Sequence, residues 1–485
     1  MFQGILYCLV FLICLAVLHK LHSRSARQVV LLAASYALYV TWGPWFAAIL
    51  LASTLVNYVV GQWLRRSQSG AILSLGILLN LALLGSFKYL PEVAVHIPFA
   101  SLQRFSHLVM PIGLSFWTFQ AMSFLFDLYR DENLDPSFLE FAVYMVFFPV
   151  TVSGPICRMP DMLQQFRSDE PTRSDDVWLG LRRIATGAFM VQLAKLLEQG
   201  ILGGDGISSG FDRLANWSGF DVWCLALGYG LQLFLDFAGY SHIAIGAAKA
   251  LGFTVPENFA RPFESTNASI FWTRWHMSLS FWIRDYVFLP LAMLRREVWW
   301  RNLALVFAML LFGLWHKASV LFLLWGCYQG ALLVLHRQIQ QVQRKVDWDP
   351  PAHIWTPVSW LATMALINFG WVFFRATSLP QAQQMLMALV SPAGYASHFL
   401  SGSLYMLVAA IGAGYTITIF VTGAIDRYTD EPQTSESTAN SGMIGFIARS
   451  RWYWLPPLYA VAMLFLLIVT LTRGASTAQF MYNKF

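Results

Sequence analysis

A histidine stands in the middle of a long apolar stretch of the chain. His316 closes the motif Gly-Leu-Trp-His at 313–316, inside the apolar run 303–335, too far from either end of the run to reach water easily. An ionisable side chain inside hydrocarbon costs about 2.5–3.5 kcal/mol, so its presence needs a physical reason. One reason is chemistry, because a neutral imidazole can take the proton of a hydroxyl that attacks a carbonyl carbon. The other is packing against a neighbouring helix, and His316 alone leaves both open.

A second region combines aromatic residues with charge. The segment 256–290 holds Arg261, Arg274, His276, Arg284 and Asp285. Drawn as one helix, residues 271–286 place polar side chains at every angle, which fits neither a lipid-facing span nor a surface amphipathic helix. We therefore expect this segment to be buried in protein or to line a water-filled cavity. The arginines that follow it, at 295, 296 and 301, indicate the cytoplasmic face, and loop charge explains them as well as phosphate binding does.

A carboxylate interrupts a third apolar run. Asp236 lies within 219–250, where an unpaired charge would be costly. We expect it to pair with an arginine of the 274–284 region. The cysteines, by contrast, give no such signal: the five are widely scattered and form no CxxC pair, so neither a disulfide framework nor a metal site is predicted.

The composition indicates the environment that surrounds most of the chain. Of 485 residues, 57% are hydrophobic and 12% charged, the latter about half the usual fraction of soluble domains. So much apolar surface with so few charges predicts an integral membrane protein surrounded by lipid. The net charge of +6 is spread along the chain without a long basic run, which argues against nucleic acid as a partner.

The apolar runs predict an all-α, polytopic fold. Residues 2–19 form a first membrane helix and not a signal peptide, because no small-residue cleavage site follows. Lys20, Arg24 and Arg27 place the first loop in the cytoplasm and the N-terminus outside, and Arg65 and Arg66 agree. Further runs that can cross the hydrocarbon are 29–43, 45–64, 71–90, 108–128, 138–156, 219–250, 303–335, 355–374, 403–422 and 453–472.

We expect about eleven or twelve membrane segments, not all of them full spans. The runs 219–250 and 303–335 are long enough for bent or paired helices. Hydrophilic breaks at 167–176 and 426–442 are predicted to be loops. Without a repeat or an appended soluble domain, the whole chain, 1–485, is interpreted as one membrane domain.

Six motifs in fixed order make the sequence resemble the membrane-bound O-acyltransferases, in the polysaccharide branch typified by the alginate O-acetyltransferase membrane subunit. They are Pro-Ile-Gly-Leu-Ser-Phe-Trp-Thr-Phe-Gln at 111–120, Ser-Gly-Pro-Ile at 153–156, Asp-Phe-Ala-Gly-Tyr-Ser at 236–241, Pro-Glu-Asn-Phe at 256–259, Trp-Thr-Arg-Trp-His-Met-Ser-Leu-Ser at 272–280 and Gly-Leu-Trp-His-Lys-Ala-Ser at 313–319. The resemblance makes 110–330 the motif core and leaves 1–100 and 350–485 as peripheral helices. It implies broken or re-entrant helices around a central tunnel.

The resemblance also implies an activity: transfer of an acyl group, usually acetyl, from a cytoplasmic thioester to a hydroxyl acceptor across a bacterial cytoplasmic membrane. The donor is acetyl-coenzyme A or an acyl carrier protein, used as a co-substrate, with no bound cofactor or metal. His316 matches the family's essential histidine and His276 its second motif position, where it orients the thioester or stabilises the oxyanion. The motifs further nominate tunnel residues, Trp315, Asn258, Asp236, Tyr240, Gln120 and Ser319. Donor phosphates are assigned to Arg261, Arg274 and Arg284.

The chain departs from the family pattern at two positions. His242 stands where an acidic residue usually follows Gly-Tyr-Ser, and Lys317 stands where glycine usually follows Trp-His. Both changes add capacity for positive charge near the motifs and leave room for an altered substrate or donor. The chain lacks the Gly-Asp-Ser motif of soluble acetylesterases, so delivery to a polysaccharide is expected to need an extracytoplasmic partner of that fold.

Other interpretations remain open at this point. Within the enzyme class, the acceptor is alternatively a lipid, a teichoic-acid-like polymer, a protein or a small secondary metabolite. From other classes, a transporter or flippase also needs buried charges and broken helices, and a non-catalytic scaffold retains motifs without activity. The absence of an internal repeat and the grouping of polar residues around two histidines favour the enzyme.

Overall fold

The computed structural model describes residues 2–430 except 22, 95–103, 131–132, 171, 202–203, 213–215 and 348–349. The chain is almost entirely helical there, and the extended pairing in these ranges is one isolated antiparallel bridge between Phe259 and Trp275. The predicted all-α fold is therefore confirmed. The apolar run 453–472 and most of the loop predicted at 426–442 lie outside the described residues.

The chain forms two compact units, each assembled from segments distant in sequence. Unit 1 contains Met1–Ile184, Tyr240–Ala260 and Trp272–Ala308, and unit 2 contains Ala185–Gly239, Arg261–Phe271 and the chain from Met309. Four helices therefore contribute to both: α10 (Ser174–Gln199), α12 (Gly219–Ala250), α13 (Ala268–Arg274) and α16 (Val298–His316). The interpretation of the chain as a single membrane domain stays a prediction.

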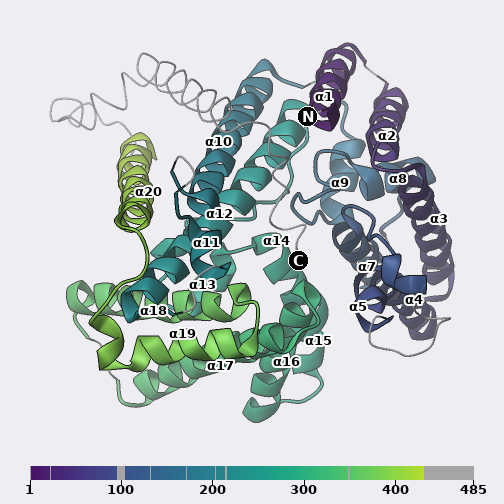
Figure 1. Cartoon of the computed structure of the whole chain (residues 1–485). Helices are drawn as coiled ribbons and strands as arrows, with labels where there is room; N and C mark the ends of the chain where they lie inside the picture. The colour runs from purple at the N-terminus through teal and green to yellow at the C-terminus, as the bar shows by residue number, and fades with distance from the viewer. Residues whose placement is uncertain are drawn as a thin grey trace, which may run out of the picture. The chain divides into compact units, whose positions relative to one another are not determined.

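Unit 1 is built on a group of antiparallel neighbours. Its helices are α1 (Phe2–Lys20), α2 (Arg24–Val40), α3 (Pro44–Ser67), α4 (Gly70–Lys88), α5 (Leu90–Ala94), α7 (Leu114–Arg130), α8 (Phe138–Val146), α9 (Met159–Phe166), α14 (Met277–Ile283) and α15 (Leu289–Met293). In Figure 1, the purple-to-blue helices α3 and α4 flank α7, and α2 packs on α8. α7 is buried along most of its length, so it forms the centre of this group.

Small residues and one amide pair bring these helices together. A Cβ atom on Gly76 of α4 would lie 2.5 Å from the end of the Leu125 side chain of α7, so a larger residue there would displace that side chain. Between α3 and α4, the Asn57 and Asn80 side chains bond to each other at 2.7 and 3.2 Å. Both amides are buried, and their mutual hydrogen bonds satisfy polar groups that hydrocarbon would not.

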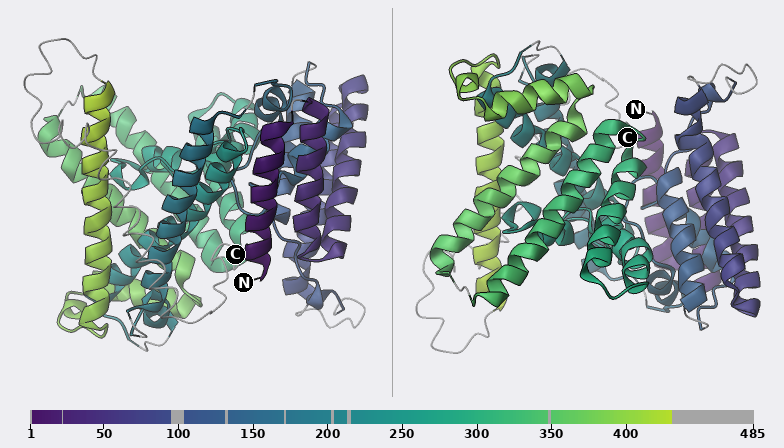
Figure 2. Two further views of the ribbon diagram at one scale, coloured as in Figure 1. Left: turned by 90° about the horizontal axis from the view of Figure 1, so that it is seen from above. Right: turned by 90° about the horizontal axis from the view of Figure 1, so that it is seen from below.

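Unit 2 contains His316 and most of the helices from the second half of the chain. They are α11 (Ile207–Asp212), α17 (Val320–Lys345), α18 (Ala352–Arg375), α19 (Leu379–Val390) and α20 (Gly402–Asp430), with α13 (Ala268–Arg274) beginning in this unit. Figure 2 shows, from below, the green helices α17 and α18 running alongside each other. α18 therefore covers the side of α17 that faces it.

Seven of the described helices are long and apolar enough to cross a membrane: α3, α4, α12, α16, α17, α18 and Gly402–Thr422 of α20. The predicted runs 29–43, 108–128 and 138–156 correspond to helices of 17 residues or fewer, and Gly4–Lys20 of the first run also counts as a shorter apolar helix. Helix α8, for example, ends at Val146, and turns continue from there to Gly154. The expectation that some segments are not full spans fits these lengths.

The two longest apolar runs behave differently. The run 219–250 is one continuous helix of 32 residues and is not paired as two elements. The run 303–335 is divided at Lys317–Ser319, where α16 ends and the Ser319 hydroxyl accepts a hydrogen bond from the Phe322 N–H to begin α17. A serine N-cap thus divides the run 303–335 into two helices, whereas no such cap interrupts the run 219–250.

The structure shows the form of residues 271–286 and corrects part of one predicted loop. Residues 271–286 do not form one helix: α13 ends at Arg274, His276 has the left-handed φ of 44°, and α14 begins at Met277. The bridge of Trp275 to Phe259 extends the chain there and forces the interruption. The hydrophilic break 167–176 is also only partly a loop, because α10 begins at Ser174 with two acidic residues that complement its N-terminal dipole.

Candidate active site

His316 lies at the end of α16, enclosed by aromatic rings of unit 2. Its side chain is 4% exposed, and its ring stacks on Phe312 at 5.3 Å between centroids. Phe374 of α18 meets it edge-on at 5.0 Å, and Trp325 of α17 does so at 5.8 Å. Trp315, predicted as a tunnel residue, contacts the ring at 4.6 Å. Three helices therefore fix the plane of this imidazole.

Close contact between α16 and α17 sets the depth of His316. A Cβ atom on Gly313 would lie 2.2 Å from the Phe322 carbonyl oxygen, and one on Gly326 would lie 2.5 Å from the Met309 oxygen. The two backbones thus touch without an intervening layer of side chains. Because α16 ends within one turn of Gly313, the crossing places His316 directly against the first turns of α17.

His276 lies in unit 1 and is held through its backbone. The residue is 1% exposed and has φ 44° and ψ 51°, a left-handed conformation that is uncommon for a side chain other than glycine. On one side of it the Ala260 N–H bonds to the Arg274 carbonyl at 3.0 Å, and on the other the Met277 N–H bonds to the Asn258 carbonyl at 2.9 Å. These bonds clamp the chain around His276. The residue lies outside the seven candidate spans, and burial lowers its pKa to about 3.

The side chain of Asn258 connects four of the sequence motifs. Its Nδ2 donates to the Ser241 hydroxyl at 2.9 Å, and its Oδ1 accepts from the Ser278 hydroxyl at 2.6 Å. The Ser278 oxygen in turn accepts from the Ile156 N–H at 3.1 Å. Asn258 is 0% exposed, so these buried groups satisfy one another. Segments up to 122 residues apart in sequence meet at this amide.

The departure at His242 is accommodated by a single arginine. Arg183 of α10 donates from Nε to His242 Nδ1 at 3.1 Å, and its other nitrogens contact both carboxylate oxygens of Glu257, one of them at 2.6 Å. Because Arg183 already pairs with the Glu257 carboxylate, it does not need an acidic partner at position 242 as well. The second departure, Lys317, is exposed at the α16–α17 break.

The predicted donor arginines have different surroundings. Arg284 is exposed, pairs with Asp285 at 2.7 Å and stacks on Phe281. Arg261, in unit 2, has the left-handed φ of 50° and donates to the Thr422 hydroxyl at 3.4 Å. Arg274 ends α13 in unit 1 and is half-buried. Because these arginines belong to different units, a shared phosphate site stays a prediction.

The remaining predicted residues are placed as follows. Gln120 is buried in α7, Tyr240 is half-buried and Asp236 buried in α12, and Ser319 caps α17. Asp236 and His316 belong to unit 2, whereas Arg274, Arg284 and His276 belong to unit 1. The predicted pairing of Asp236 with an arginine, and the shared cavity of His276 and His316, therefore stay predictions.

Sequence reasoning missed a charged cluster around Tyr286 in unit 1. The Tyr286 hydroxyl donates to Asp127 at 2.6 Å, and the Arg158 guanidinium lies 4.4 Å over its ring and bonds to Asp285 at 3.3 Å. Tyr286 belongs to a π-helical turn, Arg284–Phe288, a geometry frequent at functional sites. The signal was present, because Asp127 is an acidic residue inside the apolar run 108–128.

The Cys157 thiol and possible metal ligands among the described residues are further candidates for reactive groups. Burial raises the pKa of the Cys157 thiol far above its usual value, which disfavours the thiolate that nucleophilic catalysis requires. Among the residues that the structure describes, no three His, Cys, Asp or Glu side chains gather in a way that would hold a metal ion.

The sequence matches proteins of known family along its full length. Residues 100–377 match the profile "MBOAT, membrane-bound O-acyltransferase family". The chain is 31% identical to "Probable alginate O-acetylase AlgI" of Pseudomonas putida, with all of both chains covered. It is 31% identical to "Peptidoglycan O-acetyltransferase" of Helicobacter pylori over 76% of this chain and 75% of that one. It is 28% identical to "Teichoic acid D-alanyltransferase" of Bacillus subtilis over 55% of this chain and 69% of that one.

The predicted family is confirmed by these matches, which include both histidines and all six motifs. The transporter interpretation is thereby set aside. With its apolar helices, the chain is a multi-pass integral membrane acyltransferase, and it belongs to the membrane-bound O-acyltransferase family.

Proposed function

We propose that the protein transfers an acetyl group from a cytoplasmic thioester to a hydroxyl acceptor, with His316 as the general base, and that the acetyl group is destined for a polysaccharide. The observation that carries the proposal is the enclosure of His316 by aromatic rings at the α16–α17 crossing. Two of the relatives are named for O-acetyl transfer to alginate or peptidoglycan, which favours acetyl over D-alanyl as the acyl group.

The reaction divides into proton transfer and bond exchange. An imidazole nitrogen of His316 takes the proton of the acceptor hydroxyl as its oxygen bonds to the acyl carbon. The carbon–sulfur bond then breaks, and the leaving thiolate receives that proton from the imidazolium. Aromatic walls suit this chemistry because they exclude water, which would otherwise hydrolyse the thioester.

His276 is assigned a supporting role. A neutral imidazole in a rigid turn can donate one N–H to the oxyanion that develops on the acyl carbon or to the thioester itself. The clamp around residues 274–278 and the Asn258 hydrogen bonds support this role, since a preformed donor costs no reorganisation during the reaction. Asn258 acts in this proposal as a positioning residue and not as a contact for substrate.

The topology of the proposal follows the charges of the loops. Arg65, Arg66 and the arginines at 295, 296 and 301 lie on the cytoplasmic side of a bacterial inner membrane, with the N-terminus outside. The donor enters from the cytoplasm, near Arg261, Arg274 and Arg284. A soluble protein of esterase type on the other side passes the acetyl group to the polymer.

The test is a transfer assay with purified protein in lipid nanodiscs. Radiolabelled acetyl-coenzyme A is supplied to wild type, His316→Gln and the matched variant His353→Gln, which alters an exposed histidine of α18. We expect label release and transfer from wild type and His353→Gln, and loss of about 10²–10⁴-fold in His316→Gln. Full activity of a folded His316→Gln protein would refute the role of the histidine. Activity only with an acylated carrier protein would replace coenzyme A as the donor.

A further inference from the structure

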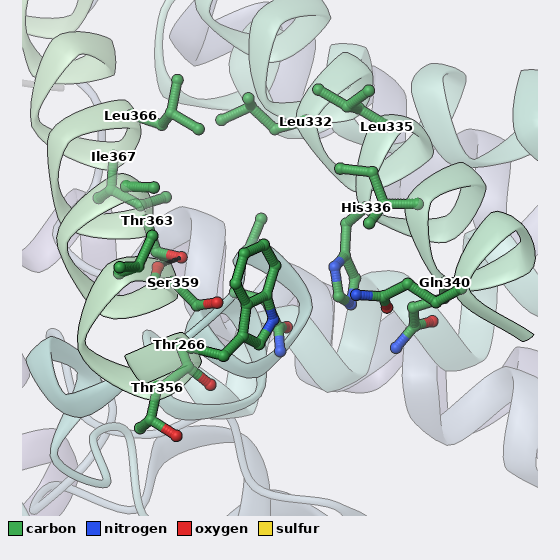
Figure 3. Close-up of a pocket in the computed structure, with 17 residues that line it drawn as sticks. Thr266, Leu332, Leu335, His336, Gln340, Thr356, Ser359, Thr363, Leu366 and Ile367 are labelled. Atoms are coloured by element: carbon green, nitrogen blue, oxygen red, sulfur yellow. Dashed lines mark hydrogen bonds between the residues drawn. The ribbon is translucent and has the colours of Figure 1, made fainter. Parts of the chain in front are cut away.

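A cavity of about 440 Å³ lies between α17, α18 and the segment 266–268. All of its lining residues belong to unit 2, and none of the residues assigned to acyl transfer is among them (Figure 3). The cavity is therefore a concave site that the proposed acyl transfer does not involve.

The lining changes from apolar to polar along the two helices. Figure 3 shows Leu332, Leu335 and Leu366 at one end and His336, Gln340 and Ser359 further along. This change coincides with the end of the apolar part of α17, because the sequence after Leu335 is His-Arg-Gln-Ile-Gln-Gln. The cavity therefore straddles the boundary between hydrocarbon and the headgroup layer.

Tryptophan side chains mark the same level on α18. Trp355 lines the polar end, and Trp360 lies nearby and donates from Nε1 to the Phe263 carbonyl at 2.7 Å. Tryptophan is enriched where a membrane meets water, since its ring is apolar and its N–H is polar. Leu335, Ile339 and Val358 line the cavity and are exposed, so it is open to the surroundings of the helices.

The lining on α17 has a length that fits one leaflet with its headgroup layer. From Leu332 to Gln343, α17 rises by about 16 Å at 1.5 Å per residue, within the roughly 20–22 Å of one leaflet when its headgroup layer is included. An occupant of this length with one apolar and one polar end has the form of a membrane lipid, whose chains lie along the leucines and whose headgroup reaches the amides and hydroxyls.

The polar end favours one class of headgroup. The lining contains no Asp or Glu, so an ammonium headgroup would find no carboxylate there. It does contain amide, hydroxyl and imidazole groups, which can donate hydrogen bonds to phosphate and exchange them with hydroxyls. Arg344 follows Gln340 by one turn on the same helix face and adds positive charge next to this end.

We propose that this cavity binds one phospholipid with an anionic, hydroxyl-bearing headgroup of the phosphatidylglycerol type. The phosphate lies between Gln340 and Arg344, the headgroup hydroxyls meet Ser359 and the amides, and one acyl chain packs on Leu332 and Leu366.

Native mass spectrometry of the full-length protein ejected from nanodiscs tests the proposal. The nanodiscs contain equal amounts of phosphatidylglycerol and phosphatidylethanolamine. We expect wild type to retain one phosphatidylglycerol, Ser359→Phe to lose it because the ring fills the polar end, and Arg344→Gln to retain it about fivefold less.

Two matched variants control for general effects. Thr418→Phe adds the same ring to an exposed position of α20, and Arg66→Gln removes an exposed arginine from the end of α3. Both should retain the lipid as wild type does. Retention of the two lipids in equal amounts by wild type, or an undiminished lipid in Ser359→Phe, would overturn the proposal. Preferential retention of phosphatidylethanolamine would overturn the assignment of the headgroup.

Discussion

The surroundings of His316 and His276 position two buried imidazoles by different physical means. Around His316, rings from α16, α17 and α18 confine the side chain by shape. Around His276, hydrogen bonds between backbone segments fix the main chain in a left-handed turn. Shape can be adjusted by neighbouring rotamers, whereas a hydrogen-bonded turn is either formed or lost. The difference suggests a base that must move with its substrate and a donor that must not move.

The largest effect should separate the two histidines by function. His316→Gln removes the general base and should lower kcat by about 10²–10⁴-fold, whereas His276→Gln, which retains an amide donor, should lower it less. Single-turnover rates with labelled acetyl-coenzyme A measure both. Equal losses in the two variants would break the distinction between base and supporting donor.

The hydrogen-bonded turn should be sensitive to a single amide. Asn258→Ala leaves buried partners unsatisfied and should reduce the free energy of unfolding by about 1–3 kcal/mol and also lower kcat. If Asn258 acts through His276, its substitution should change kcat little in a His276→Gln background. Melting curves and rates of the two single variants and the double variant provide the cycle.

Asn80→Ala is the matched control for that cycle. Asn80 is also a buried amide of unit 1 with a side-chain partner, Asn57, but it lies between α3 and α4. It should cost similar stability and show no coupling to His276. Independent effects of Asn258 and His276 on kcat would contradict the positioning role.

Substitutions in the aromatic enclosure of His316 should lower kcat less than the loss of a hydrogen bond at the His276 turn. Phe374→Leu keeps an apolar wall but removes the edge-on ring contact with His316, which is worth about 0.5–1.5 kcal/mol. We expect a moderate loss of kcat with a small loss of stability. Phe141→Leu, at a fully buried ring of α8 in unit 1, should destabilise the protein without lowering kcat of the folded fraction. A loss from Phe374→Leu as large as that from His316→Gln would show that the enclosure is as strict as the turn.

The last prediction concerns the dependence of stability on pH, at unchanged kcat. Burial lowers the pKa of His276 to about 3. As the pH falls, the His276 imidazole of the unfolded chain is therefore protonated near pH 6.5, whereas that of the folded chain stays neutral down to about pH 3. Stability is therefore complete above about pH 6.5 and is lost as the pH falls towards 3, by about 2 kcal/mol at pH 5. Tm measured between pH 7 and 5 should fall less in His276→Gln than in wild type. Parallel curves for the two proteins would show that His276 is not kept neutral by the fold.

The features that depend on residue type and local motifs could be predicted from the sequence. Sequence reasoning singled out His316, although it placed the residue in the middle of an apolar run and not at the end of a helix, and it identified the motifs that the structure gathers around Asn258. It missed that α12 is continuous, because hydropathy reports length and not the presence of a cap. It also missed the left-handed His276, since that conformation depends on a bridge to Phe259, a residue of another segment. Such tertiary pairings cannot be read from periodicity.

The backbone contact between α16 and α17 has a consequence for motion. Where Gly313 and Gly326 let the helices touch, no side chains lie between them that could slide or change rotamer. The last turn of α16 and the first turns of α17 should therefore move as one rigid body during turnover. Of the three helices whose rings enclose His316, α18 is then the one that can move relative to the imidazole, and Phe374 is the ring that would move with it.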